Sequence, residues 1–232
     1  GKADEPSPSS AAVRGRRVYV SEGCIHCHSQ YVRPGSSDEE IWGPPPELAS
    51  VLQGEPVLIG NRRQGPDLTN IGARRSVPWL KQHFINPRAL APDSPMPSYA
   101  HLFDDGRGDD LVRYLKESGV GATADVMARA AAWKPGVAAG GDGRSWFEAH
   151  CAVCHGDGGR GDGPLAGKFI RPPANLVDGP FIWTAAGEDL ATRTARVIKF
   201  GIPGTDMPGH EVMTEAQVNA LADTVLGLRS NQ

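Results

Sequence analysis

Two short segments of the sequence share the spacing C-x-x-C-H, and this spacing restricts the fold more than any other feature. Together the two copies use every cysteine of the chain, and their members are Cys24, Cys27, His28, Cys151, Cys154 and His155. The pattern is typical of covalent haem attachment. Two thiols on one helical turn reach both vinyl groups of a porphyrin, and the adjacent imidazole meets the iron. We therefore predict two haem c groups with His28 and His155 as iron ligands.

Other uses of C-x-x-C are a zinc site built from all four cysteines, a thioredoxin-like redox pair and a disulfide between the two neighbours. A histidine directly after both copies argues against each of these alternatives, because none of them requires it. With every cysteine assigned to haem, none remains for a structural disulfide. His26, which lies inside the first motif, is predicted to be a surface residue that points away from the ring.

Each motif is followed, after a proline-rich region, by a methionine in a Met-Pro pair, so the chain contains an internal repeat. These are Met96 in "SPMPSY" and Met207 in "GTDMPGH". A following proline holds each methionine in extended backbone, which suits a thioether ligand presented from a loop. Met96 and Met207 are therefore the predicted second iron ligands. The rival candidates are Met213, His83, His101 and His210.

Composition limits the other classes of function. Apolar residues make up 39% of 232 residues, and 29 glycines and 20 prolines indicate a loop-rich chain in which two haems supply apolar bulk. A formal net charge of −3 excludes a nucleic-acid-binding surface as the main function. The sequence contains no run of about 18 apolar residues that could cross a bilayer. The opening "GKADEPSPSSAA" reads as a flexible leader, and any signal segment or membrane anchor would precede residue 1.

Helix-forming patterns dominate and no strand pattern is convincing, so the predicted fold is all-α. Expected helices are 12–22, 77–85, 108–118, 143–150, 188–200 and 215–228. Gly119 and Gly201 stand where helix C-caps are expected, and Thr214 to Gln217 reads as a capping box. The predicted organisation is a leader (1–13), a first haem domain (14–119), a linker (120–142) in which Trp133 docks on one domain, and a second haem domain (143–232).

Both halves resemble class I cytochrome c domains, over residues 12–118 and 141–229. The resemblance implies that the first and last helices of each domain cross, with Tyr19 and Tyr114 at the first crossing. Thr224 stands where the family usually has an aromatic residue, and Trp146 or Phe147 would compensate for it. The family also uses a proline carbonyl to orient the haem-ligating imidazole. The matching prolines are Pro66 in "GPDL" and Pro173 in "RPPANL".

The first half resembles a narrower family. Its segments "GCIHCHSQYVRP", "GPDLTNIGARRS", "WLKQHFINPRALAPDSPMPSY" and "DLVRYL" are similar to the monohaem cytochrome c subunit of cbb-type haem–copper oxidases. That subunit is membrane-anchored, faces the periplasm and relays electrons to the catalytic subunit. No such anchor is expected within the given residues, and a second haem domain is expected to follow. In "SQYVRP", Arg33 and Pro34 are interpreted as a support of the local fold, a contact to a haem propionate, or a plain surface turn.

The main functional hypothesis is a dihaem electron-transfer cytochrome, an oxidase subunit or relay rather than an enzyme on its own. Its partners would be redox proteins, including a membrane haem–copper oxidase, and membrane association would come only through a missing anchor or a partner subunit. Thioether attachment implies a location in the periplasm or on the periplasmic face of the cytoplasmic membrane. Paired arginines, such as Arg74 with Arg75, could bind haem propionates or an acidic partner. The alternative hypothesis is a dihaem enzyme that reduces peroxide or oxidises small sulfur compounds at one haem.

Overall fold

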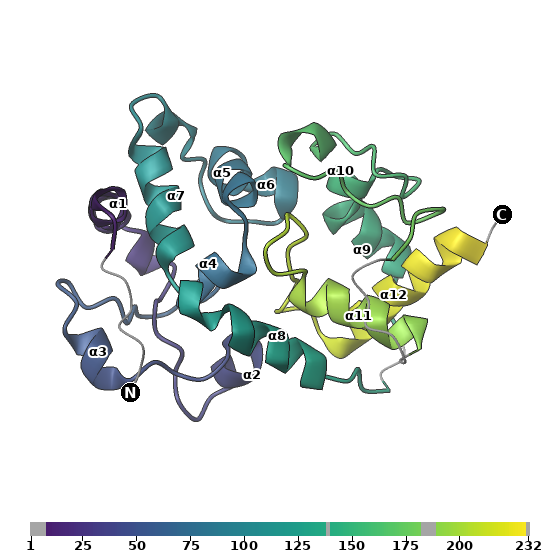
Figure 1. The fold of residues 1–232 in the computed structure, drawn as a ribbon, viewed down its shortest axis with the longest axis horizontal. Helices are drawn as coiled ribbons and strands as arrows, with labels where there is room; N and C mark the ends of the chain where they lie inside the picture. The colour runs from purple at the N-terminus through teal and green to yellow at the C-terminus, as the bar shows by residue number, and fades with distance from the viewer. Residues whose placement is uncertain (1–7, 138–139, 182–188, 231–232) are drawn as a thin grey trace.

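The protein forms two helical lobes that lie side by side, joined by a helix that runs along both (Figure 1). The computed structural model describes three stretches of the chain, residues 8–137, 140–181 and 189–230. Within them there is no β-strand, only an isolated bridge between Gly201 and Pro208, so the predicted all-α fold is confirmed. Residues 1–7 of the predicted leader, and residue 188 at the start of a predicted helix, lie outside the described residues.

The lobes differ in how many short helices they contain. The first lobe consists of α1 (Ser10–Ser21), α2 (Asp38–Trp42), α3 (Leu48–Leu52), α4 (Ile71–Arg74), α5 (Val77–Ile85), α6 (Pro87–Leu90) and α7 (Arg107–Glu117). The joining helix is α8 (Thr123–Ala132), and the second lobe consists of α9 (Gly143–His150), α10 (Ala152–His155), α11 (Leu190–Phe200) and α12 (Glu215–Ser230). Short 3-10 turns lie at Cys24–His26, Ala100–Phe103, Val120–Ala122 and Ala166–Lys168. Among the described helices, none combines the length and apolar character that a bilayer span requires.

All six predicted helices are present, with ends that differ by at most two residues among the described positions. Local chemistry explains this agreement, because side chains cap the helices where the sequence indicates. The Ser76 hydroxyl accepts a hydrogen bond from the backbone N–H of Trp79 at the start of α5. Before α12, Thr214 N–H donates to Gln217 Oε1 and Gln217 N–H donates to Thr214 Oγ1, at 2.8 and 3.3 Å, which is the predicted capping box.

In the first lobe, α1 crosses α7 so closely that a glycine is required. A Cβ on Gly15 would lie 1.9 Å from the carbonyl oxygen of Asp110 and 2.7 Å from Cβ of Tyr114. One turn along α1, the ring of Tyr19 packs edge-on against the ring of Tyr114, with centroids 5.8 Å apart. This is the aromatic crossing that the sequence predicts, and it closes the core of the lobe.

The second lobe repeats the crossing with different residues. Gly143 of α9 lies against α12, where a Cβ would come within 2.1 Å of the Ala220 carbonyl oxygen and 2.3 Å of Thr224 Oγ1. Four residues after each glycine comes the buried aromatic residue, and Phe147, which is fully buried, therefore takes the place of Tyr19. Thr224 takes the place of Tyr114, and its hydroxyl donates to the Ala220 carbonyl at 2.8 Å. Phe147 lies in the core of this lobe and Trp146 packs against that core, so both of the aromatic residues considered as compensation lie near the crossing.

The segment expected to be a linker contains a full helix with contacts on both sides. From α8, Arg129 Nη2 donates to the carbonyl of Glu40 at 2.6 Å, which attaches the helix to the end of α2. At the other end, the Trp133 ring packs edge-on against Phe200 of α11, with centroids 5.7 Å apart, and its carbonyl accepts from Arg196 at 3.1 Å. The segment therefore braces the two lobes.

The crossing at Gly15 generates a stability prediction. Replacement by alanine favours an isolated helix by about 1 kcal/mol, but here the added methyl group meets backbone, so we expect Gly15→Ala to destabilise the haem-loaded protein by ~1–3 kcal/mol. Gly227 of α12 is the matched control, because nothing lies within 4 Å of a Cβ there. Gly227→Ala should leave stability equal or higher. Urea unfolding followed by circular dichroism measures both, and equal stability of the two variants would contradict the crossing.

Candidate haem sites

The first C-x-x-C-H motif lies on a tight turn directly after α1. Gly23 takes left-handed backbone angles (φ 70°), and the backbone N–H groups of Cys27 and His28 both donate to the carbonyl of Cys24, at 3.2 and 2.9 Å. Cys24, Cys27 and His28 all line one large cavity. His26 lies outside that lining and is exposed, as expected for a surface residue.

The ring of His28 is held in one orientation from the "GPDL" segment. Its Nδ1–H donates to the carbonyl of Pro66 at 2.8 Å, and because a carbonyl only accepts, the proton must be on Nδ1. Nε2 then carries the lone pair that a metal ligand needs. Gly65 lies directly against the imidazole ring, because a Cβ there would lie 2.3 Å from Cε1 of His28. Burial lowers the pKa of His28, which keeps the imidazole in the neutral, metal-binding form.

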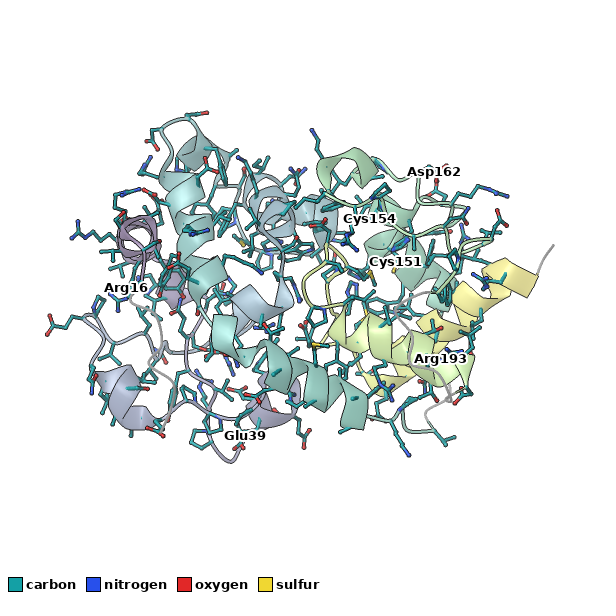
Figure 2. The ribbon with its side chains drawn as sticks, in the orientation of Figure 1. Arg16, Glu39, Cys151, Cys154, Asp162 and Arg193 are labelled. Carbon is teal, nitrogen blue, oxygen red and sulfur yellow. The ribbon has the colours of Figure 1, made fainter. Side chains whose placement is uncertain are left out.

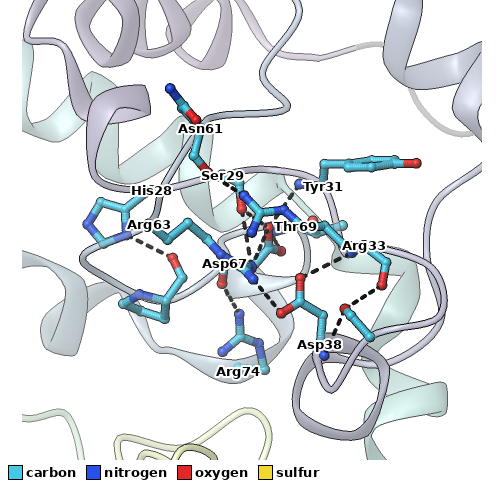
Figure 3. Close-up of polar contacts among 12 residues, drawn as sticks. His28, Ser29, Tyr31, Arg33, Asp38, Asn61, Arg63, Asp67, Thr69 and Arg74 are labelled. Atoms are coloured by element: carbon cyan, nitrogen blue, oxygen red, sulfur yellow. Dashed lines mark hydrogen bonds and ion pairs between the residues drawn. The ribbon is translucent and has the colours of Figure 1, made fainter.

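Asp67, the residue after Pro66, is fully buried and ties this loop to the haem-motif tail (Figure 3). Its carboxylate accepts from the Ser29 hydroxyl at 2.5 Å and from the backbone N–H of Tyr31 and Thr69, each at 2.9 Å. The guanidinium of Arg63 lies 3.7 Å away and compensates the buried charge. The carboxylate thus joins the segment that carries His28 to the segment that holds its ring.

Arg33 of "SQYVRP" supports the local fold (Figure 3). Its backbone N–H donates to Asp38 at 3.2 Å, and its guanidinium donates to the carbonyl of Asn61. Asp38 in turn pairs with Arg63. Neither Arg33 nor the exposed Pro34 lines the cavity, so of the three interpretations of this tail, support of the local fold agrees with the contacts of Arg33.

The second motif lies where α9 ends and α10 begins, and Figure 2 shows Cys151 and Cys154 close together on the inner side of that lobe. His155 is oriented as His28 is, since its Nδ1–H donates to a backbone carbonyl at 2.9 Å. That carbonyl belongs to Ala174, so the choice of Pro173 from the sequence is wrong by one residue. The two consecutive prolines in "RPPANL" do not indicate which carbonyl of the loop faces the histidine. Pro173 does line the cavity.

The chemistry of the cysteines separates haem attachment from the other uses of C-x-x-C. Burial raises the pKa of Cys24 and Cys154 to about 11 and that of Cys151 to about 12, whereas a thioredoxin-like pair requires a lowered pKa. All four cysteines are free rather than joined in disulfides. Within the described stretches, no three His, Cys, Asp or Glu side chains gather closely enough to hold a metal ion, so the two pairs do not converge on a zinc site.

The two Met-Pro segments have the same local geometry. The backbone N–H of Met96 donates to the hydroxyl of Ser94, and that of Met207 donates to the hydroxyl of Thr205, both at 3.2 Å. Each methionine is therefore fixed by a hydroxyl two residues earlier, and both line the cavity. The two halves therefore repeat the backbone contact at the Met-Pro segment as well as the spacing of the C-x-x-C-H motif.

Three of the four rival ligands, Met213, His83 and His210, also line the cavity, and they differ from Met96 and Met207 in their other contacts. Met213 is buried and packs in the core of the second lobe, although part of it borders the cavity. His83 stacks on the ring of Trp79 with centroids 4.8 Å apart, and burial lowers its pKa to about 4. His210 lines the cavity beside His150, with ring centroids 6.2 Å apart. His101 is exposed and lies outside the cavity lining.

All ten residues that the sequence selects for cofactor binding line one cavity of about 970 Å³, and this is the test of fit for haem. They are Cys24, Cys27, His28, Pro66, Met96, Cys151, Cys154, His155, Pro173 and Met207. Pockets for drug-sized ligands measure ~300–1,000 Å³, so the cavity has the size for large apolar groups. Two thiols, an imidazole with a directed lone pair and a thioether in each half match the donor set of haem c.

Sequence reasoning missed the residues that join the two halves of this cavity. Arg74 and Arg75 were considered for propionates or an acidic partner, and their acidic partner is Glu211 of the second lobe, at 3.4 and 2.7 Å. No pattern in the sequence singles out this glutamate. Three further arginines have partners within the chain: Arg14 binds Asp110, Arg16 binds the carbonyls of Glu55 and Pro56, and Arg63 binds Asp38.

The network around Asp67 generates a second stability prediction. Asp67→Asn removes the buried charge that accepts three hydrogen bonds and faces Arg63, so we expect the haem-loaded protein to unfold more easily by roughly 2–4 kcal/mol. The matched control is Asp109→Asn, which removes the exposed pair with Lys81 at 3.1 Å and should change stability by less than about 0.5 kcal/mol. Urea unfolding compares the two, and a neutral effect of Asp67→Asn would refute a structural role for the network.

Comparisons with known proteins agree with this geometry. A family model described as "Cytochrome C oxidase, mono-heme subunit/FixO" matches residues 7–134, and a model described as "Cytochrome c" matches residues 141–228. No curated protein matches significantly. Among solved structures, a chain of a reducing HAO-like protein complex from Kuenenia stuttgartiensis is 19% identical over 98% of this chain and all of its own, with a TM-score of 0.34, which is too low to inform the argument.

The FixO model covers α1 to α8, which include the first C-x-x-C-H motif, Pro66 and Met96. The cytochrome c model covers the second motif, Met207 and the crossing of α9 with α12. The chain therefore belongs to the FixO family of mono-haem cytochrome c oxidase subunits, with a cytochrome c domain following the FixO domain, as in a dihaem cytochrome c.

Proposed function

We propose that this chain is a dihaem c-type cytochrome that transfers single electrons between redox protein partners, as a periplasmic relay to a terminal haem–copper oxidase. The observation that carries the proposal is the single cavity lined by two complete sets of haem-binding residues. When bound, each haem supplies an iron that gains and loses one electron. Membership of the FixO family supports the oxidase as the partner.

In this proposal each iron would be held by one imidazole and one thioether of the chain. His28 and His155 present Nε2 because Pro66 and Ala174 bind the opposite nitrogen. Met96 and Met207 provide the thioethers, each held by the hydroxyl hydrogen bond to its backbone N–H. Such a pair of ligands leaves no position for a substrate and favours a higher reduction potential. The residues are thus arranged for electron transfer rather than for catalysis at an open iron.

The shared cavity supports exchange of electrons within the chain. Residues of both lobes line it, among them Trp79 and Pro95 of the first lobe and Trp146 and Pro208 of the second. An electron that enters at one site can therefore reach the other inside the protein, without an encounter between two molecules. This property distinguishes a two-site relay from two independent carriers on one chain.

Carbon monoxide binding tests the proposal directly. The reduced native protein, which should contain two covalent haems by mass, is expected not to bind carbon monoxide at either site, because all axial positions are taken. Rapid binding at one haem in the native state would overturn the carrier function and support the dihaem enzyme. Recovery of an oxidase core with the full protein from native membranes would support the proposed partner, and recovery of the cytochrome alone would count against it.

Replacement of the methionines generates a more specific prediction. Met207→Ala should open one iron to carbon monoxide and lower the reduction potential of that haem, and Met96→Ala should do the same at the other haem. Met127→Ala is the control, because that side chain is 57% exposed on α8 and should change neither property. If Met213→Ala, and not Met207→Ala, produced the change, Met213 would be the ligand. Spectroelectrochemical titration measures the two potentials.

A further inference from the structure

The two lobes are joined by a buried ion pair between Arg75, directly after α4, and Glu211, in the loop before α12. Arg75 donates from Nη1 to Glu211 Oε1 at 2.9 Å and from Nη2 to Oε2 at 2.7 Å, a bidentate contact. Arg74 Nη1 lies 3.4 Å from the same carboxylate. Burial alone would raise the pKa of Glu211, but Arg75 and Arg74 outweigh it and lower the pKa to about 2. The pair is therefore charged and almost entirely shielded from water.

The contacts of Arg75 extend beyond the carboxylate. Its Nη2 also donates to the carbonyl of Gly209 at 2.7 Å, and its guanidinium lies over the ring of Trp79, 4.9 Å from the centroid. Arg75 therefore holds both the side chain of Glu211 and the backbone of the loop that precedes it. A lysine could not replace this geometry, because only the planar guanidinium forms two parallel bonds and a third to the carbonyl.

These contacts bracket Met207. On its C-terminal side, Arg75 binds Gly209 and Glu211. On its N-terminal side, the hydroxyl of Ser76 pairs with the carboxylate of Asp206, which also accepts from the backbone N–H of Ile170 at 3.0 Å. Two consecutive residues of the first lobe therefore hold both ends of the segment that carries Met207. Within the second lobe, the carbonyl of Met207 accepts from Ile202 at 3.1 Å.

The same residues continue to the haem-binding loop of the first lobe. Arg74 donates to the carbonyl of Asp67 at 2.8 Å, and Asp67 follows Pro66, whose carbonyl holds His28. A continuous path of hydrogen bonds and ion pairs thus runs from the ring of His28 to the loop of Met207. The steps that Arg74 makes to Asp67 and Glu211 are buried, so water does not compete with them.

We propose that Arg75 and Glu211 are positioning residues that fix Met207 from the neighbouring lobe, so that the first haem domain sets the ligation and reduction potential of the second haem. The inference rests on the proposed function, in which Met207 is an iron ligand. Stability alone is a weak reason for such a pair, since the desolvation of two buried charges can cancel their attraction. The pair has a different use if it orients the loop that places the sulfur atom of Met207. That use does not require the pair to stabilise the fold.

The experiment compares Arg75→Gln, Glu211→Gln and the double variant with an exposed arginine–carboxylate pair that also makes two hydrogen bonds. The control is Arg14→Gln with Asp110→Asn, because Arg14 binds Asp110 through two bonds of 2.6 Å inside the first lobe, away from both methionines. The readouts are the absorption band of methionine-ligated ferric haem, the two reduction potentials, and carbon monoxide binding after reduction.

We expect the Arg75 and Glu211 variants to weaken the methionine band by up to half, to lower one potential of two, and to let carbon monoxide bind at one haem. The control variants should keep the native spectrum and both potentials. A single variant that leaves a buried charge without its partner could misfold. Arg75→Gln leaves Glu211 paired with Arg74, so it tests the positioning without an unpaired buried charge, whereas the variants of Glu211 leave Arg74 without its carboxylate. A native spectrum and native potentials in the double variant would overturn the inference.

The outcome for Met207→Ala separates this inference from the function on which it rests. If that variant fails to change the spectrum, Met207 is not a ligand and the proposed site itself is wrong. If it opens one haem while the double variant stays native, the site stands and only the positioning by Arg75 and Glu211 is refuted. Ser76→Ala supplies an independent test, because it removes the contact to Asp206 and should lower the same potential as the double variant.

Discussion

The close crossing of the first and last helix in each lobe is the contact on which the rest of the structure depends. At Gly15 and at Gly143 the two helix backbones come so close that a methyl group would not fit between them. One turn later an aromatic ring, Tyr19 or Phe147, lies buried in the core. The crossing brings the two ends of a long, loop-rich segment together. The loops between these two helices line the cavity. They are held in place because the crossed helices fix both ends of the loop-rich segment.

Polar contacts determine how those loops present their side chains. Each histidine has one ring nitrogen bound to a carbonyl, each methionine has its N–H bound to a hydroxyl, and the buried carboxylate of Asp67 joins the two segments around His28. Such contacts remove rotational freedom before a metal is bound, which is the principle by which outer residues tune a site. The second buried carboxylate, Glu211, does for the pair of lobes what Asp67 does within the first lobe.

Much of the fold could be predicted because it depends on local patterns. Helix ends followed capping residues such as Ser76 and Thr214, and the haem motifs followed from spacing alone. Errors occurred where the outcome depended on loop register or on distant partners. The carbonyl that holds His155 belongs to Ala174 rather than Pro173, since neither proline of the pair marks the turn. The linker segment has an alanine-rich sequence that favours the helix α8, and only the fold shows that Arg129 and Trp133 contact different lobes.

The sequence by itself determined the two haem motifs, the all-α class, the repeat of Met-Pro segments and the family of the first half. These properties depend on residue types at short, regular separations, which act in the same way in any context. Only the tertiary structure decided that both sets of residues line one cavity, that Arg33 supports a loop, and that Arg75 binds Glu211 beside Met207. Glu211 lies 136 positions from Arg75 in the chain. Only the packed lobes bring such distant charges together and shield their contact from water.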